Sequence, residues 1–296
     1  MIKATIIADS ISHQGIRMTT FEFEYPRFIH SEVMTHRMLS KNAASSRAIP
    51  IERMHEAIKT DAGTPIYWGK NQTGMQAKEE LSGSDLSNVK NYWLMAQADA
   101  IEWSREMANM GLHKQIANRV TEPFQTMKTI ISGTEWANFF WLRDHPDAQP
   151  EFQRLAASAK AAFQISKPNF LKPGEWHLPY INNARSDEGV VIYSNNNQIL
   201  TLQDAQTISA SCCAQVSYRR LDDTLEKAQM IFDRLINTTP VHASPVEHQA
   251  TPIPDLVGFE VWPKGVTHMR RDRSMWSGNL RGWIQFRQTL PNHTVW

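Results

Sequence analysis

A run of alternating side chains near the N-terminus limits the fold of this chain more than any other feature. In MTTFEFEY, residues 18–25, the aromatic residues Phe21, Phe23 and Tyr25 occupy every second position, and polar residues lie between them. A period of two is typical of a β-strand with one apolar and one polar face. Pro26 ends the pattern. The chain therefore needs a sheet whose one face packs against apolar residues.

Other patterns predict further elements around this strand. The irregular segments are expected at 61–88, which is rich in Gly, Ser, Asn and Gln, and at 252–276. On the helix that follows Pro26, Glu32, His36 and Ser40 would line one face. The amphipathic helix of 89–110 would turn Trp93 and Trp103 toward a core. The full set is a strand at 3–8, helices from Pro26 to about Ser40 and over 89–110, 113–120, 147–166, 204–218 and 223–237, and a hairpin with an Asn-rich turn over 190–202.

Composition bounds the class of protein. The chain has 296 residues, of which 41% are hydrophobic and 21% charged, as in an ordinary globular protein. No composition break forces a boundary, so we expect a single domain over 1–296. The net charge of +1 gives no general attraction to nucleic acid or to an anionic membrane, so any anion site must be local. The start MIKATIIADS does not have the form of a signal peptide, and no apolar stretch reaches the length of a membrane span.

The cysteine content indicates the compartment. Cys212 and Cys213 are adjacent in sequence and cannot form an ordinary disulfide. They are interpreted as part of a small buried helix face, and a reducing cytoplasm is expected.

The segment THRMLSKNAASSRAIP, residues 35–50, is the strongest candidate for a binding site. Arginine forks and hydroxyls both donate to phosphate oxygens, so this cluster fits a phosphate ester. The alternative is a solvated helix end with a serine-rich cap, which uses the same residue types. The residues concerned are His36, Arg37, Ser40, Asn42, Ser45 and Arg47.

Three further clusters carry polar side chains that could do chemistry. HASPVEH, residues 242–248, could hold a metal through histidine and glutamate, but Pro245 interrupts any helix and a capping turn is favoured. The segment that follows the aromatic run at 134–143 places Asn138 and Arg143 ahead of a helix, although Arg143 could simply form a surface ion pair. KQIANRVTEP, residues 114–123, would by default be a solvated helix face. Dinucleotide, P-loop and nucleophile-elbow motifs do not occur.

Together these segments resemble the flavin-dependent thymidylate synthases, the thymidylate synthase complementing proteins. Their signature is close to RHRxxSxNExSxR, and this chain has THRMLSKNAASSR, with Thr35 and Ala43 departing from it. NFFWLRDHPDAQPEF is similar to the family's second motif, which places Asn138, Arg143, Ala148, Gln149 and Glu151. GLHKQIANRV resembles a helix that supplies another nucleotide-binding arginine, with Arg119 as the candidate and Asn118 one position away.

A third block is similar to the family but stands in an unusual place. SASCCAQVSYRR and HASPVEHQA resemble two motifs that precede the signature in familiar members, whereas here they follow it. A circular permutation of the same elements explains this order, because permutation is tolerated where termini lie close at the surface. Longer, phage-type members have this arrangement.

The resemblance implies an activity, a fold and an assembly. The reaction would be reductive methylation of dUMP to dTMP, with methylenetetrahydrofolate as carbon donor, FAD as hydride carrier and NADPH as reductant. The fold would be α+β, a twisted antiparallel sheet with packed helical hairpins. The assembly would be a homotetramer with sites between subunits, in the cytoplasm or the host cytoplasm, without membrane, nucleic acid or metal.

The resemblance also implies roles for individual residues. Arg143 and Ser45 would be catalytic, polarising the uracil ring. Glu32 occupies the place of a family glutamine and is left out, because it would set a carboxylate near an anion. The dUMP-binding residues would be Ser45, Ser46, Arg47, Arg119 and Arg143, and the FAD-binding residues His36, Arg37, Asn42, Asn138, Ser217, His242, Ser244 and Glu247.

Three rival functions remain open from the sequence. The nearest is a flavin-dependent enzyme that leaves a hydroxymethyl group on dUMP, for which Thr35 and Ala43 leave room. A non-catalytic nucleic-acid-binding protein could stack bases on RRDRSMW, residues 270–276. A metal hydrolase could use His242, Glu247 and His248.

Overall fold

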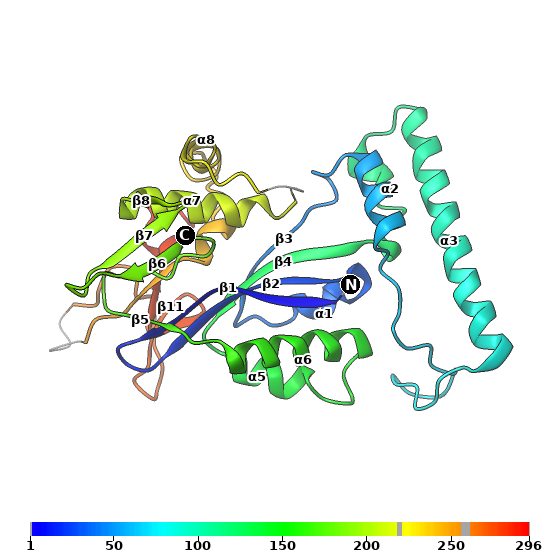
Figure 1. Cartoon of the computed structure of the whole chain (residues 1–296), viewed down its shortest axis with the longest axis horizontal. Helices are drawn as coiled ribbons and strands as arrows, with labels where there is room; N and C mark the ends of the chain where they lie inside the picture. The colour runs from blue at the N-terminus through cyan, green and yellow to red at the C-terminus, as the bar shows by residue number, and fades with distance from the viewer. Residues whose placement is uncertain (1, 218–220, 256–260, 296) are drawn as a thin grey trace.

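The computed structural model describes residues 2–217, 221–255 and 261–295, and it has an α+β fold dominated by antiparallel strands (Figure 1). The strands are β1 Lys3–Ser12, β2 Arg17–Pro26, β3 Ser40–Ala43, β4 Thr126–Gly133, β5 Asn169–Leu171, β6 Asn182–Arg185, β7 Val191–Asn195, β8 Gln198–Leu200, β9 Ala250–Pro252, β10 His268–Met269, β11 Met275–Ser277, β12 Leu280–Arg281 and β13 Trp283–Gln285. The α-helices are α1 His30–Met34, α2 Ile51–Thr60, α3 Gly83–Asn109, α4 Lys114–Ala117, α5 Trp136–Arg143, α6 Pro150–Ile165, α7 Leu202–Ala214 and α8 Leu225–Leu235. Short 3-10 turns are η1 Arg27–Ile29, η2 Glu122–Phe124, η3 Gln215–Ser217, η4 Ser244–Glu247 and η5 Phe286–Thr289.

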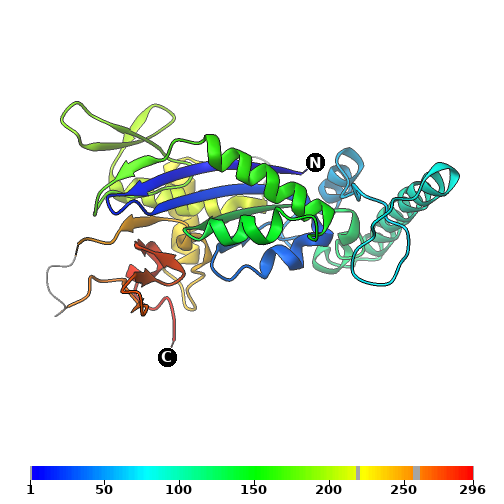
Figure 2. The ribbon, with the colours of Figure 1, turned by 90° about the horizontal axis from the view of Figure 1, so that it is seen from below.

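The central sheet has five strands in the order β3-β4-β2-β1-β5. Its neighbours pair antiparallel except β1 and β5, which run parallel. The expected strand at 18–25 is confirmed as β2, in register with both β1 and β4. The apolar face of β2 packs as predicted, because Phe21, Phe23 and Tyr25 are buried against α5 and α6. Figure 2 shows this helical pair lying along one face of the sheet.

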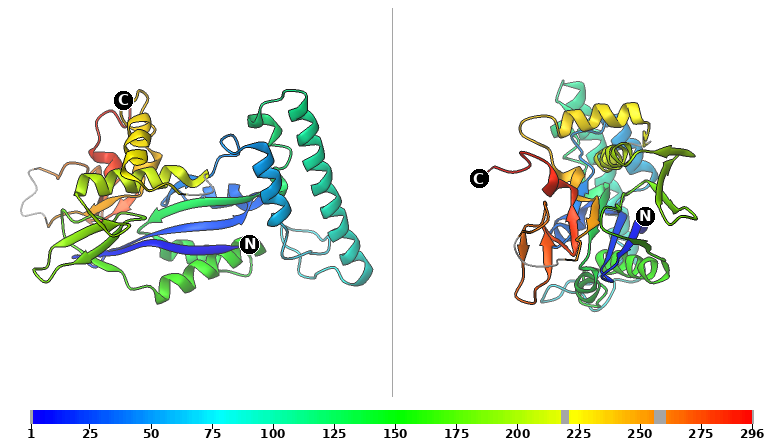
Figure 3. Two further views of the ribbon diagram at one scale, coloured as in Figure 1. Left: turned by 45° about the horizontal axis from the view of Figure 1, so that its top comes forward. Right: turned by 90° about the vertical axis from the view of Figure 1, so that its left-hand side faces the viewer.

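The opposite face of the sheet is also covered. Ile130 of β4 packs against Cys213 of α7 and Val216 of η3. Both views in Figure 3 place α7 and α8 on the side of the sheet away from α5 and α6. Thr20, predicted on a polar face, is therefore fully buried, and Cys213 lies on a buried helix face as the sequence predicted.

A continuous chain of buried polar side chains crosses the sheet. His177 contacts the hydroxyls of Ser10 and Thr20 at 2.9 and 2.8 Å. The Thr20 and Ser132 hydroxyls are 2.6 Å apart, and Ser132 reaches Nδ1 of His248 at 2.8 Å. Burial lowers the pKa of His177 to about 4 and that of His248 to about 3, since a charged ring would be desolvated. Both rings are therefore neutral in the folded protein.

Three predicted elements are wrong in part. The helix after Pro26 ends at Met34, and Ser40 lies in β3 instead, because residues 40–43 complete a ladder with β4. Ser40 therefore shares no helix face with His36. The helix at 113–120 is limited to α4, and the long helix α3 starts before position 89. Trp103 on that helix is 62% exposed rather than part of a core.

Of the remaining predictions, the hairpin agrees with the structure, whereas the two segments predicted irregular agree only in part: residues 83–88 belong to α3, and 252–276 contains the short strand β10 and the start of β11. The hairpin is confirmed as β7 and β8, with Asn196 and Asn197 at φ 46° and 63°, as a tight turn of type I′ requires. The 61–82 connection is irregular, except for a bridge between Gly69 and Glu80. Within the predicted irregular segment 252–276, residues 256–260 lie outside the described residues, and so do residues 218–220 of the third block. The single-domain organisation stays a prediction.

The buried histidines predict a pH dependence of stability. In the unfolded chain both rings titrate near 6.5, so the unfolded state binds more protons than the folded state between about pH 6.5 and 4. The stabilisation is complete above pH 6.5 and is lost as the pH falls. Across that window we expect His177 alone to account for roughly 3 kcal/mol of the free energy of unfolding.

Urea denaturation between pH 7 and 5 measures this loss. His177→Gln should reduce the slope, whereas the control His145→Gln, which changes an exposed ring, should keep it. A free energy of unfolding that stays constant over this range would contradict neutral buried rings.

Candidate functional site

The predicted signature lies along one edge of the central sheet. Residues 35–39 form the turn between α1 and β3, β3 pairs with β4, and residues 44–50 lead on to α2. Helix α5, which follows β4, brings Asn138 and Arg143 back to the start of this segment. Two motifs that are distant in sequence therefore meet at one place.

Arg143 and His36 are in direct contact there. Arg143 Nε donates to His36 Nε2 at 2.8 Å, and Nη2 lies 3.3 Å from Thr35 Oγ1. The guanidinium also lies over the Phe152 ring, 4.7 Å from its centroid. Burial, and then the positive charges of Arg143 and Lys41, lower the pKa of His36 to about 4. A neutral imidazole can accept the Arg143 hydrogen bond, so His36 fixes the guanidinium plane, and Nη1 lies 4.0 Å from Glu32 Oε2 in a long ion pair.

A cavity of about 280 Å³ contains this pair. The cavity brings together residues with two predicted roles. His36, Arg37 and Asn138 were predicted to bind FAD, and Arg143 was predicted to bind the nucleotide. The side chains of Arg37 and Asn138 make no hydrogen bond or ion pair with any described residue, so their donors are free for a ligand. The lining residues are Thr35, His36, Arg37, Met38, Leu39, Glu135, Asn138, Phe139, Leu142 and Arg143.

A second group of predicted residues gathers where β3 meets η3 and η4. Asn42 Nδ2 donates to the Cys213 carbonyl at 2.5 Å, and the Ser244 hydroxyl donates to Asn42 Oδ1 at 3.4 Å. The Ser45 backbone N–H donates to Ser217 Oγ at 2.8 Å. Residues of the third sequence block thus lie directly against the signature.

Glu247 belongs to the same neighbourhood but already has a partner. It forms an ion pair with Arg287, and its backbone carbonyl accepts from Gln285 Nε2 at 3.1 Å. His242 is exposed, and its side chain makes no hydrogen bond or ion pair within the described part of the chain.

A third group surrounds the loop at 45–50. Buried Asn118 donates to the carbonyls of Ser46 and Ile49 at 2.8 and 2.9 Å. Arg119 is exposed and donates to Glu122 at 2.8 Å, and the Ser46 hydroxyl donates to the same carboxylate at 3.4 Å. Asn118 therefore holds the loop, and Arg119 is the charged group that lies at the surface.

Not all predicted residues meet within one chain. Arg47 is exposed and has no hydrogen-bond or ion-pair partner among the described residues. Neither Arg47 nor His242 lines the two cavities that contain Arg143. One chain thus builds the Arg143 cavity and presents Arg47 and His242 elsewhere on its surface.

One functional candidate, Lys41, was missed from the sequence, and the contact made by Glu151, which the sequence placed in the second motif, was not predicted. Lys41 Nζ is held by the carbonyls of His36 and Leu39, and burial lowers its pKa to about 8. Its position between Ser40 and Asn42 inside the signature could have indicated it. Glu151 is 1% exposed and accepts from the Ile66 N–H at 2.7 Å and from Gln149 at 2.8 Å. No local signal predicts that contact, because Ile66 lies in a distant loop.

The rival sites do not assemble. His248 is buried on Ser132, Glu247 pairs with Arg287 and His242 is exposed, so the three proposed metal ligands point to different partners. No group of three or more potential ligands that could hold a metal occurs within residues 2–217, 221–255 and 261–295. Burial raises the pKa of the Cys212 thiol to about 12, so it is not an activated nucleophile.

The proposed base-stacking surface is already occupied. Trp276 is 1% exposed, Arg270 lies 3.7 Å from its ring centroid and His268 stacks at 5.9 Å. A nucleobase cannot stack on a ring that is covered in this way.

The fold and the site define an α+β protein with a cavity at the sheet edge that is lined by two arginines and a glutamate, Arg37, Arg143 and Glu135. A family model described as thymidylate synthase complementing protein matches residues 15–169, more than half of the chain, and includes both the signature and Arg143. The chain therefore belongs to the thymidylate synthase complementing protein family.

Other comparisons are more distant. No curated protein matches the sequence. Among solved structures, the chain is similar to the UMP/dUMP methylase PolB from Streptomyces cacaoi, bound with 5-Br UMP, at 16% identity and a TM-score of 0.44. The match covers 55% of this chain and 88% of that one. In the described part of the chain, no helix has both the length and the apolar character needed to cross a bilayer.

The Arg143 contact predicts the titration of His36. In the protein free of ligands, NMR of the imidazole should give a pKa near 4, because burial and Arg143 both disfavour the charged ring. Arg143→Gln should raise this pKa, since it removes the neighbouring charge and keeps a hydrogen-bond donor. Arg154→Gln, at an exposed position on α6, is the matched control and should leave it unchanged. A pKa near 6.5 for His36 in the wild-type protein would contradict its assignment as a neutral hydrogen-bond acceptor.

Proposed function

We propose that this protein catalyses the reductive methylation of dUMP to dTMP, using methylenetetrahydrofolate as carbon donor, FAD as redox cofactor and NADPH as reductant. The observation that carries the proposal is the meeting of two family motifs in one cavity, where His36 of the signature holds Arg143 of the second motif. Membership of the family supports the activity, and the free donors of the cavity support an anionic ligand.

The nucleotide would be bound by cations and hydroxyls from three segments. Arg143 would direct its Nη1 toward the uracil or its phosphate, and His36 would keep the guanidinium in plane. Ser45 and Arg143 would donate to a uracil carbonyl and stabilise the charge that develops in the ring. Ser46 and Arg119 both contact Glu122, so a phosphate entering there would have to displace that carboxylate.

The residues present fit a flavin. Arg37, Asn138 and His242 have unused polar atoms, as a phosphate-bearing cofactor requires of its ligands. The remaining flavin ligands would be Asn42, Ser217, Ser244 and Glu247. Ser244 contacts Asn42, Ser217 contacts the Ser45 backbone, and η4, which carries Glu247, packs on β3, so these residues already lie close together. When bound, the flavin would supply hydride, and the protein would orient the nucleotide against it.

Assembly as a homotetramer is part of the same proposal. Helix α3 stands away from the body of the molecule (Figure 1), and large apolar side chains on it face solvent. Tyr92 is 66% exposed and Trp103 62%, and their spacing places them on one face of the helix; Met110, which follows the last residue of the helix, is 84% exposed. Such a face is typical of an interface. Light scattering of the purified protein should give four chains, and a monomer at working concentration would contradict the assembly.

The direct test of the activity is the product. Flavin-loaded protein incubated with dUMP, methylenetetrahydrofolate and NADPH should yield dTMP by mass spectrometry. A product heavier by one oxygen would indicate the hydroxymethylating alternative, and unchanged dUMP would refute both.

Arg143 tests the nucleotide site. Arg143→Ala should abolish dUMP binding in calorimetry, because it removes the cation that His36 positions. Arg154→Ala is the matched control, since that exposed arginine lines neither cavity that contains Arg143. Circular dichroism should show both variants folded. Undiminished dUMP affinity in Arg143→Ala would refute the assigned role.

His242 tests the cofactor site. His242→Ala should weaken flavin retention, measured as the ratio of flavin absorbance to protein absorbance after purification. The side chain is exposed and unpartnered among the described residues, so the fold should be unaffected. A variant that purifies with a full complement of flavin would show that His242 does not bind it.

A further inference from the structure

An aromatic cavity of about 460 Å³ lies between the 61–82 connection and helix α3. Its walls include Trp68 and Tyr67 from the connection, Trp93 from α3 and Phe28 from η1. Trp93 meets Trp68 edge-on at 5.9 Å and Phe28 edge-on at 6.2 Å, with interplanar angles of 84° in both cases. The aromatic rings that line the cavity are nearly perpendicular, so they present both ring faces and ring edges to it. Such a surface suits the binding of a planar aromatic ligand.

The connection that forms this cavity is fixed at both ends of its bend. The Leu81 N–H donates to the Trp68 carbonyl at 2.9 Å and the Lys70 N–H to the Glu79 carbonyl at 2.8 Å. Gly69 lies at the base of the bend, where an added Cβ would come within 2.1 Å of Ala77 Cβ. The close approach of the two sides therefore requires glycine, and it holds the Trp68 ring in the wall.

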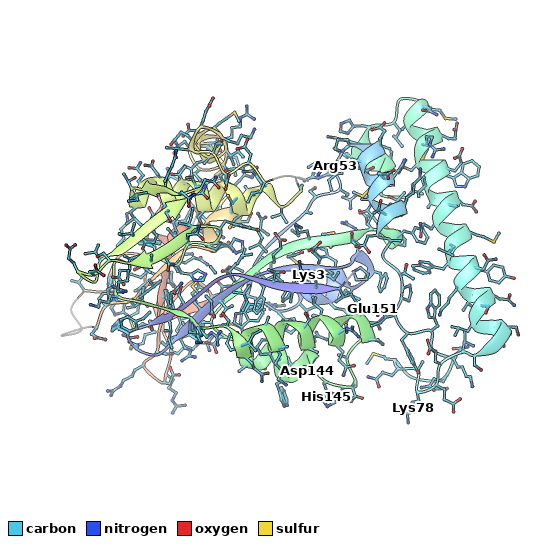
Figure 4. The ribbon with its side chains drawn as sticks, in the orientation of Figure 1. Lys3, Arg53, Lys78, Asp144, His145 and Glu151 are labelled. Atoms are coloured by element: carbon cyan, nitrogen blue, oxygen red, sulfur yellow. The ribbon has the colours of Figure 1, made fainter. Side chains whose placement is uncertain are left out.

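Buried Glu151 ties the same connection to the Arg143 site. Its carboxylate accepts from the Ile66 N–H, one residue before Tyr67, and from Gln149. Figure 4 places Glu151 at the end of α6 nearest this connection, with Lys78 further out along it. The Glu151 side chain is 1% exposed, and its hydrogen bond with the Ile66 N–H joins two segments that are distant in sequence. Glu151 therefore holds the connection against the start of α6.

The aromatic cavity adjoins a second one of about 500 Å³. The two share Tyr67, Gly69 and Gln149 as lining residues, and the second is also lined by Arg143 and Glu32. A molecule that lies against the aromatic walls can therefore extend past the shared residues toward the proposed dUMP site.

Two polar groups accompany the aromatic walls. Trp93 Nε1 is buried and has no hydrogen-bond partner among the described residues. Gln149 uses its Nε2 on Glu151, and its Oε1 accepts no hydrogen bond from any described residue. Trp93 Nε1 is buried, so the polar atom that this cavity offers is Gln149 Oε1, which matches a ring that carries an N–H donor rather than a hydrocarbon.

We propose that this cavity binds the planar heteroaromatic ring of a co-substrate, with the rest of that molecule directed toward Arg143. The inference rests on the proposed function, which supplies two molecules of this chemistry, a reduced folate with its pterin ring and a nicotinamide nucleotide. Trp68 and Tyr67 are binding residues for that ring, and Glu151 is a positioning residue that holds their connection in place.

Calorimetry on the flavin-loaded protein tests the proposal in two arms, one with tetrahydrofolate under anaerobic conditions and one with NADP⁺. Trp68→Ala should weaken binding of one of the two at least tenfold and leave dUMP affinity within twofold. The arm that responds identifies the source of the ring. Trp141→Ala is the matched control, because that tryptophan is 75% exposed on α5 and lines neither cavity. Unchanged affinity for both molecules in Trp68→Ala would overturn the proposal.

Amide hydrogen exchange on the wild-type protein gives an answer that does not depend on the folding of a variant. Exchange over 66–81 should slow when the responding molecule is bound, and exchange that stays the same would overturn the proposal. If dUMP binding requires Arg143 but neither co-substrate responds to Trp68, only this inference fails. If the wild-type protein does not bind dUMP, the proposed function fails.

Discussion

The ladder between β3 and β4 is the constraint on which the site depends. Ser40 pairs with Ser132 and Asn42 with Ile130, so a short polar segment becomes the edge of the central sheet. Residues before it then face α5, and residues within and after it face η3 and η4. Without this pairing the signature would be a helix end followed by a solvated loop, which is the arrangement its composition also allows. The ladder thus turns a local cluster of donors into a surface that two other motifs can reach.

Electrostatics then decides how that surface can be used. Burial, reinforced by the guanidinium of Arg143, keeps the pKa of His36 low, and the neutral imidazole in turn accepts the guanidinium hydrogen bond. Across the sheet, burial keeps His177 and His248 neutral and lets them bridge β1, β2 and β4 through hydroxyls. His248 ends the segment that carries Ser244 and Glu247. The buried network therefore fixes the position of one motif, while the half-buried Arg143–His36 pair fixes the guanidinium of another.

The sequence was most informative where the signal was local. Alternation predicted β2 and the burial of Phe21 and Phe23, and the Asn-rich turn predicted the β7–β8 hairpin. It was wrong where tertiary pairing overrides local preference, as at Ser40, which fits a helix face by spacing but is taken into a strand by β4. It was also wrong at Trp103, because a helical period does not say whether the covering partner belongs to the same chain. The contacts of Asn42 with Cys213 and of Glu151 with Ile66 join residues with no pattern in common, so only the folded chain reveals them.

The division of the predicted site within one chain has a physical consequence. Arg143 has a cavity with partners that fix it, whereas Arg47 and His242 are exposed and unpartnered among the described residues. An isolated exposed cation gains little from binding an anion in water, because solvent screens the interaction. The same cation contributes far more when a second surface excludes water from one side. The exposed apolar face of α3 offers a means to bring a second surface, since its burial would favour association by the hydrophobic effect. Association through α3 could bring the Arg143 cavity of one subunit opposite Arg47 and His242 of another. The residues that lie apart in one chain would then form a single site between two subunits, as the family's motifs imply.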